Sequence, residues 1–137
     1  MVQIINLQRK LVIKTEQIQA AAERALANER KRFFELNIVL VDKMKMRQLN
    51  RRFRDCDEPT DVLAFDYGKG KAEVIVSVDA AREYSLENKI PLMKELYLYI
   101  IHGILHLVGY DDESRKEGLK MSKRQNDILE SIWEKEI

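Results

Sequence analysis

Apolar and polar positions follow two rhythms along this chain, and together they predict strands and helices. Short apolar runs predict four strands, and apolar residues three or four positions apart predict about five helices. The predicted strands cover residues 1–8, 36–41, 62–67 and 73–78, and the predicted helices cover 15–33, 42–54, 79–88, 91–109 and 113–137. This order predicts an α+β fold, a small mixed four-stranded β-sheet with helices packed on it. No repeat or linker interrupts it, so we expect a single domain over residues 1–137.

Boundary residues sharpen these predictions. Thr15, Asp42 and Asp79 stand where three predicted helices begin, and such side chains commonly cap a helix. Pro91 suits the first position of the fourth helix. The glycine-rich residues 68–71 suit a hairpin loop. Residues 36–41 are nearly all apolar, which predicts a central strand.

Composition narrows the class of protein. Hydrophobic residues make up 45% of the chain, enough for a real core, and the net charge of +1 neither predicts nor excludes a nucleic-acid partner. The single cysteine, Cys56, excludes an internal disulfide and fits a reducing compartment. The first residues lack the pattern of a signal peptide, and no apolar run approaches the ~20 residues of a membrane span. We therefore expect a cytoplasmic protein with no membrane segment.

The only two histidines, His102 and His106, lie four positions apart. Four residues is about one helical turn, so both imidazoles leave the same face as adjacent ligands for one metal ion. Gly109 is expected to end the helix, so that the chain turns back and presents Asp111 or Asp112 as a third ligand. Two imidazoles and a carboxylate suit zinc and leave a coordination position open for water.

The histidine spacing matches that of zinc proteases, H-E-x-x-H, except that Gly103 stands where the protease has glutamate. That glutamate is the general base of peptide hydrolysis, so its absence argues against this mechanism. We expect the glycine to leave room beside the metal for a bulky group.

Arginines recur along one flank of the predicted helix 42–54, at Arg47, Arg51 and Arg54. Such a stripe favours a basic groove for nucleic acid, and the Arg54 guanidinium could offer two parallel hydrogen bonds to a phosphodiester. The same arginines could instead pair with local acids such as Asp55 and Asp57.

These motifs resemble the YbeY family of bacterial metal-dependent endoribonucleases, which act in ribosomal RNA maturation. Residues 102–112, HGILHLVGYDD, resemble the family's H-G-x-L-H-L-x-G-Y-D-H. Residues 50–54, NRRFR, resemble N-x-x-Y/F-R, and residues 59–65, PTDVLAF, resemble P-T-D-V-L-S-F. The resemblance covers essentially the whole chain. It implies a zincin-like arrangement in which His102, His106 and Asp112 bind the metal and Arg54 is catalytic.

The chain departs from the family at Asp112, where the signature has its third histidine. A carboxylate still binds zinc, although it could favour another metal such as nickel, iron or manganese. Asp111 is the competing ligand, or it could hold the second ring nitrogen of a histidine. Residues 72–74, AEV, replace the family's G-D-I.

The resemblance implies a zinc-dependent endoribonuclease specific for single strands, with ribosomal RNA precursors as substrate. It also implies the small ribosomal subunit or ribosome-associated proteins as partners. The nucleophile stays open between water and the ribose 2′-hydroxyl. Alternative readings are a metal-dependent hydrolase of another substrate, such as a peptidase, and a non-catalytic RNA-binding or ribosome-assembly factor with a structural metal. A protein-interaction domain built on the C-terminal helix would explain none of the motif.

Other polar residues near these motifs suit structural roles. Thr60 and Asp61 stand where a loop enters a strand, and we expect their side chains to bond nearby backbone. Cys56 is not expected to be a nucleophile, because the histidines that could serve as its base belong to the metal motif. Tyr110 could stack on a base, but packing is the favoured role.

Overall fold

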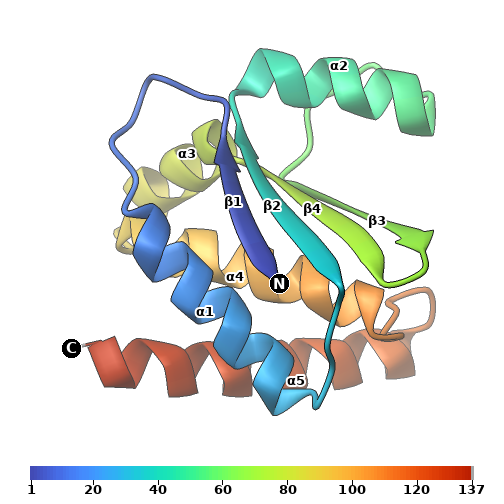
Figure 1. Cartoon of the computed structure of the whole chain (residues 1–137). Helices are drawn as coiled ribbons and strands as arrows, with labels where there is room; N and C mark the ends of the chain where they lie inside the picture. The colour runs from blue at the N-terminus through green and yellow to red at the C-terminus, as the bar shows by residue number, and fades with distance from the viewer. Residues whose placement is uncertain (137) are drawn as a thin grey trace.

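The computed structural model describes residues 1–136 and confirms the predicted α+β fold, a mixed four-stranded sheet with helices on both faces (Figure 1). Among the described residues, no helix combines the length and apolarity needed to cross a membrane. The elements are β1 (Val2–Asn6), α1 (Thr15–Asn28), β2 (Glu35–Val41), α2 (Lys43–Arg54), β3 (Val62–Gly68), β4 (Lys71–Ser77), α3 (Val78–Asn88), α4 (Leu92–Leu107) and α5 (Arg115–Glu136).

The strands lie in the order β1-β2-β4-β3, so β2 is an interior strand as predicted, and β3 is outermost. β1 pairs with β2 and β2 pairs with β4 in parallel, whereas β3 and β4 form an antiparallel hairpin. The hairpin turns at Lys69 and Gly70, which have φ angles of 55° and 76°. Positive φ at both central residues is the geometry of a tight hairpin turn. β4 therefore begins at Lys71, two residues before the predicted start.

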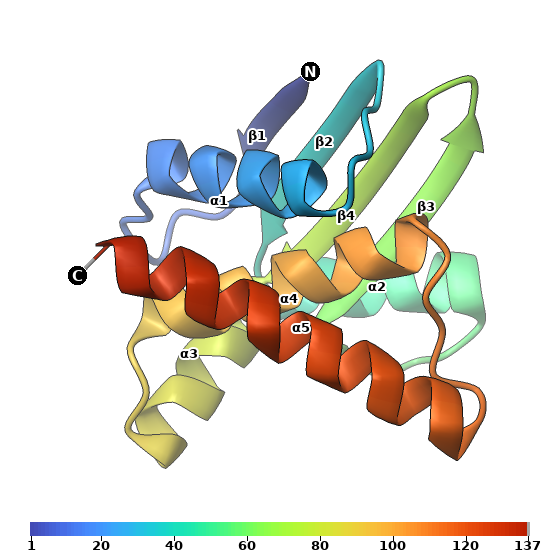
Figure 2. The ribbon, with the colours of Figure 1, turned by 90° about the horizontal axis from the view of Figure 1, so that it is seen from below.

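The sheet separates two cores of unequal size, because successive side chains of a strand point to opposite faces. Figure 2 shows α1, α4 and α5 on one side of the sheet and α2 on the other. We call the α4 side the large core; it receives Leu36, Ile38 and Leu40 of β2 and Ala72, Val74 and Val76 of β4. The small core, on the α2 side, consists of Val39, Val41, Met46, Leu63 and Ile75.

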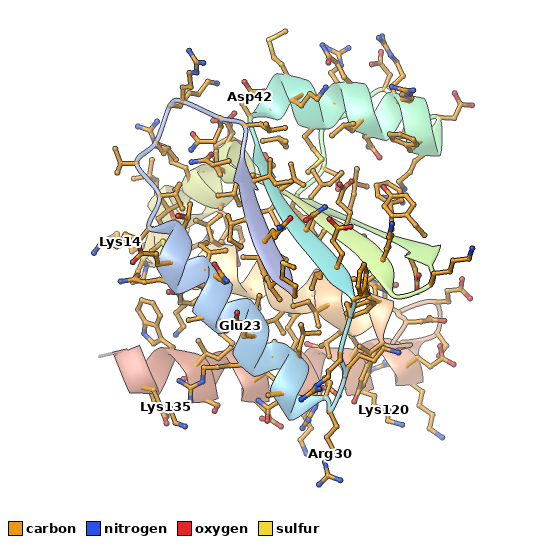
Figure 3. All side chains as sticks on the ribbon, in the orientation of Figure 1. Lys14, Glu23, Arg30, Asp42, Lys120 and Lys135 are labelled. Carbon is orange, nitrogen blue, oxygen red and sulfur yellow. The ribbon has the colours of Figure 1, made fainter. Side chains whose placement is uncertain are left out.

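Helix capping agrees with the prediction at one helix and differs at another. The Asp42 carboxylate accepts a 2.8 Å hydrogen bond from the backbone N–H of Lys45, and Figure 3 shows Asp42 where β2 passes into α2. The prediction for Asp79 is wrong, because the Ser77 hydroxyl caps α3. Asp79 instead accepts a 2.6 Å hydrogen bond from the backbone N–H of Lys43. It thereby ties the start of α2 to the start of α3.

The predicted cap and the predicted C-terminal end of α1 are also wrong, although the helix begins at residue 15 as predicted. Thr15 is the first helical residue, Lys14 occupies the cap position, and no side chain caps this helix (Figure 3). The helix ends at Asn28 rather than Phe33, and Arg30 follows with a φ of 53°. Phe33 is buried in the large core from the loop that follows, so its apolar character continued the helical pattern past the true end.

The last two helices differ from prediction by one or two residues at their described ends. Pro91 precedes α4 instead of opening it, and α4 ends at Leu107. Gly109, with a φ of 109°, turns the chain as predicted. α5 starts at Arg115 rather than residue 113, and Ile137, its predicted last residue, lies outside the described residues.

Candidate metal centre

One side of α4 packs into the large core, and both histidines of this helix line a cavity of about 400 Å³. Gly103 lies between them, and a Cβ built there would come within 2.6 Å of Val74 Cγ1 and 3.3 Å of Val62 Cγ2. The helix can therefore lie this close to the sheet only because residue 103 has no side chain. The glycine is thus required for this close packing, and because Gly103 also lines the cavity next to the histidines, the predicted room beside the metal stays a prediction.

Three side chains converge as a possible metal-binding cluster. His102, His106 and Asp112 each offer one ligand atom, and these atoms lie within 4.8 Å of one another. The two histidine Nε2 atoms are 3.1 Å apart. Two nitrogens on a tetrahedral zinc ion would be separated by about 3.3 Å, so this donor set fits such an ion.

The structure groups Asp112, and not Asp111, with the histidines. The Asp111 carboxylate instead accepts a 2.7 Å hydrogen bond from the backbone N–H of Glu113. This bond shapes the turn that follows Gly109. Asp112 is exposed, whereas the histidines are half-buried.

Gln125 of α5 orients the first histidine, and sequence reasoning missed it. Its Oε1 lies 2.7 Å from His102 Nδ1. An amide oxygen can only accept, so Nδ1 carries the proton and Nε2 keeps its lone pair for a metal. Such a partner fixes the tautomer and the direction of a ligating imidazole. Gln125 lies 23 residues away on another helix, and no local spacing links the two residues.

Arg54 reaches the same place from the opposite face of the sheet. It lies at the end of α2 and lines a cavity of about 400 Å³ together with His102, His106 and Asp112. Residues 60–65, from the end of the α2–β3 loop into β3, form the remaining wall with Gly103. A cation therefore faces a cluster of metal-binding groups across one cavity, which suits an anionic ligand.

The other arginines of the stripe pair locally. Arg47 donates two hydrogen bonds to the Asp57 carboxylate, at 3.0 and 3.1 Å, and Arg51 lies 3.9 Å from it. These bonds from Arg47 hold the pKa of Asp57 below its ordinary value. The alternative of pairing with a local acid is thus confirmed for Arg47, while Asp55 instead ends α2 with a φ of 53°.

A short hydrogen-bonded loop connects Arg54 to β3. Buried Asn50 donates from Nδ2 to the Glu58 carbonyl at 2.7 Å, which holds the loop against α2. The Asp61 carboxylate accepts from the Val62 N–H at 2.8 Å and from the Thr60 hydroxyl at 3.4 Å. The predicted bond to nearby backbone is confirmed for Asp61, whereas Thr60 donates to the Asp61 side chain, and both residues also line the cavity.

A second cavity, of about 250 Å³, adjoins the first and shares Asp61, Val62 and His102 with it. Sequence reasoning missed its buried acid, Glu95, and the neighbouring Tyr99. Burial raises the pKa of the Glu95 carboxyl, a hydrogen bond from Tyr99 opposes this, and the charge of Asp61 raises it further. Burial likewise raises the pKa of Tyr99. The spacing was a usable signal, because Glu95, Tyr99 and His102 recur at intervals of four and three.

Comparison with known proteins places these features in one family. The sequence profile of the family Endoribonuclease YbeY matches residues 3–133. The chain is 31% identical to an Endoribonuclease YbeY of Syntrophotalea carbinolica over 145 aligned positions, covering 98% of this chain and 97% of the relative. It is 34% identical to that of Bacillus mycoides, covering 93% and 86%. The solution structure of TM1509 from Thermotoga maritima superposes with a TM-score of 0.71 at 30% identity, covering 98% and 91% of the two chains.

Proposed function

The chain belongs to the YbeY endoribonuclease family, and from that premise we propose that it cleaves single-stranded RNA with a divalent metal during ribosomal RNA maturation. The observation that carries the proposal is the shared cavity, in which Arg54 faces His102, His106 and Asp112. In such a site, the arginine can bind a phosphodiester while a metal held by the other three side chains activates it.

The three clustered side chains would hold the metal, most favourably zinc, which supplies Lewis-acid activation of water or of a phosphate oxygen. His102 presents Nε2 because Gln125 accepts the Nδ1 proton. Asp112 contributes a negative charge where the family signature has a neutral histidine, which reduces the net charge of the loaded site.

Arg54 would bind the phosphate and offset the negative charge that develops during attack. Within the described residues, Arg47 is committed to Asp57, whereas no hydrogen bond to an acid holds Arg54. Its guanidinium is therefore available to a ligand in the cavity. Either water or the ribose 2′-hydroxyl could be the nucleophile at this site.

Two observations favour RNA over a peptide substrate. Gly103 stands in place of the protease general base, and Val74 fills the adjacent space, so no carboxylate can act from that position. Arg54 adds a cation that a phosphodiester uses and a neutral peptide bond does not.

The first test measures the metal. Elemental mass spectrometry on tag-free protein is expected to find about one zinc per chain, or one nickel, iron or manganese ion, in wild type and none in His106→Ala. Absence of metal in both proteins, even after incubation with all four ions, would remove the metal-dependent mechanism. A non-catalytic RNA-binding or assembly factor would then be the better account.

The second test measures cleavage of unstructured RNA. Arg54→Ala should lower kcat by about 10²–10³-fold, because a charge-stabilising donor is lost. Arg52→Ala is the matched control, because this substitution removes the same charge from the same helix. The Arg52 guanidinium lies over the Phe53 ring, 5.3 Å from its centroid, and does not line the cavity. Equal losses in both variants would show that only general charge matters and would refute the assigned role of Arg54.

We place this activity in the cytoplasm, on ribosomal RNA precursors in contact with the small ribosomal subunit. Deleting the gene should leave ribosomal RNA ends unprocessed, and a wild-type copy should restore them where a His106→Ala copy does not. If the His106→Ala copy also restored processing of the ribosomal RNA ends, the role in maturation would not require metal-dependent cleavage by this protein.

A further inference from the structure

We propose that the cavity beside His102, formed where α3, α4 and α5 meet the start of β3, receives the base of a nucleotide next to the scissile phosphate and selects bases that carry an exocyclic amino group. The proposal rests on the proposed function, because it assumes that the substrate is RNA. It assigns a specificity subsite to side chains that the metal centre does not use.

The second cavity adjoins the proposed phosphate site. The two cavities share Asp61, Val62 and His102, so a nucleotide whose phosphate lies between Arg54 and the metal ligands has its neighbouring base within reach of the second cavity. Single-stranded RNA is recognised in this way, with the phosphate held in a charged groove and the base turned into a pocket.

The size of the second cavity suits a base. A volume of about 250 Å³ corresponds to the space that roughly eight water molecules occupy in the liquid. A nucleobase has about as many non-hydrogen atoms, so the cavity has room for one base.

The two cavities differ in the charged side chains that line them. Glu95 and Asp61 give this cavity two carboxyl groups, whereas Arg54 lines only its neighbour. The neighbouring cavity also contains the carboxylates of Asp61 and Asp112, and there Arg54 and a bound metal would offset their charge. Neither arginine nor lysine is among the residues that line the second cavity, so it suits a base with an amino group better than a phosphate.

Hydrogen bonding determines which bases fit. The Glu95 side chain is buried and the Tyr99 hydroxyl donates to it, which leaves acceptor capacity on the carboxylate. The amino groups of cytosine, adenine and guanine can donate to that carboxylate. Uracil presents a carbonyl oxygen where cytosine has the amino group, and two acceptors facing each other leave a buried group unpaired.

The mouth of the cavity supplies a stacking surface. Tyr84 of α3 lines the cavity, and the residue is 46% exposed, so its ring is open to a ligand. Leu98 adds an apolar wall. An aromatic ring stacks on any base, so Tyr84 contributes affinity and Glu95 contributes the choice of base.

The experiment compares oligocytidylate with oligouridylate of equal length, because the two bases differ at the amino position and have the same size. Wild type should cleave oligocytidylate with a kcat/KM about tenfold higher. In Glu95→Gln the amide can also donate, so the preference should fall to less than about twofold. Glu87→Gln, an exposed change on α3 outside the cavity, is the control and should keep the wild-type preference.

A second readout does not depend on turnover. Fluorescence anisotropy on metal-free protein should show tighter binding of oligocytidylate in wild type and similar binding of both oligonucleotides in Glu95→Gln. Tyr84→Ala should weaken both by about tenfold without changing their ratio. Tyr67→Ala, an exposed tyrosine of β3 outside this cavity, should have no such effect.

The outcomes separate the two proposals. If metal-loaded wild type cleaves neither oligonucleotide, the proposed function fails, and the binding preference still decides the base pocket. Equal cleavage and equal binding of both oligonucleotides by wild type would overturn the pocket alone. If Glu95→Gln does not fold, as judged by circular dichroism, Tyr84→Ala decides: unchanged affinity for both oligonucleotides would overturn the proposal.

Discussion

The two faces of the sheet carry different halves of the candidate site on very different foundations. The histidines project from α4, which is embedded in the large core together with α1 and α5. Arg54 projects from the exposed end of α2, which covers the small core alone. The proposed metal-binding half therefore lies on a deeply packed helix, and the proposed phosphate-binding half lies on a lightly packed one.

This difference matches what each half has to do. Metal ligands must keep a fixed mutual geometry, and close packing of α4 on the sheet through Gly103 provides it. A phosphate clamp has to admit and release a long polymer. Its helix is held to the following loop by Asn50 and by the exposed Arg47–Asp57 pair, and to α3 by Asp79. Small shifts of α2 can thus move Arg54 without disturbing the histidines.

The largest expected effect comes from weakening each core in turn. Ile104→Ala, in the large core between α4 and the sheet, should lower the free energy of unfolding by about 4 kcal/mol. Met46→Ala, in the small core, should cost about 2 kcal/mol, because α2 can settle onto the sheet. Urea unfolding measures both values, and metal titration should show weaker zinc binding only in Ile104→Ala. Equal losses of zinc affinity would contradict the proposed independence of the two halves.

Gln125 tests whether the metal half depends on the helix behind it. Gln125→Ala removes the acceptor that fixes the His102 imidazole, and zinc affinity should fall by about 10–100-fold. The site is half-buried and close to solvent, so the free energy of unfolding of the metal-free protein should change little. A competition assay with a zinc-binding dye gives the affinity. Unchanged affinity would show that the packing of α4 alone orients the ring.

The two helical glycines sharpen the same contrast. Gly103→Ala should destabilise the protein by about 1–3 kcal/mol, because the new methyl group meets Val74. Gly118→Ala, on α5, should stabilise it by about 0.5–1 kcal/mol, because its nearest neighbours are at 3.9 Å and alanine favours a helix. Thermal unfolding monitored by circular dichroism distinguishes the two signs. Stabilisation by both changes would mean that α4 can move away from the sheet without cost.

The smallest effect is expected from the exposed pair of Arg47 on α2 and Asp57 in the following loop. Arg47 lowers the pKa of Asp57, so the stability that the pair adds is fully present above the ordinary Asp57 pKa of 3.8 and is lost as the pH falls through the lower folded-state value. Both side chains are exposed, so salt should screen the contribution. Asp57→Asn should lower the melting temperature slightly at neutral pH and low salt. The same difference in strong acid would argue against an ion pair.

Local patterns predicted much of this molecule. The interior position of β2 follows from its nearly all-apolar run. Helical spacing and a glycine stop predicted that His102 and His106 meet Asp111 or Asp112, and the resemblance to the YbeY family selected Asp112. Features that join distant segments were not predictable in this way. Gln125 meets His102 only because α5 packs on α4, and no rule of spacing reaches across 23 residues.

The wrong predictions have a similar cause. Asp79 has the right chemistry for a cap, but Ser77 stands two residues earlier and caps α3 first, which frees Asp79 for α2. The prediction for Gly103 was incomplete, because it considered only the space beside the metal. Close packing of α4 against Val74 of β4 is the reason that a glycine is needed.

The outermost position of β3 has a consequence for self-association. Residues 62–65 of this strand line the cavity that contains the candidate metal cluster, and β3 pairs with β4 on one side only. An unpaired strand edge is a template onto which another chain can add, which is a common route to aggregation. A substrate that enters the cavity covers part of this edge. Occupancy of the site should therefore also shield the protein from edge-to-edge polymerisation.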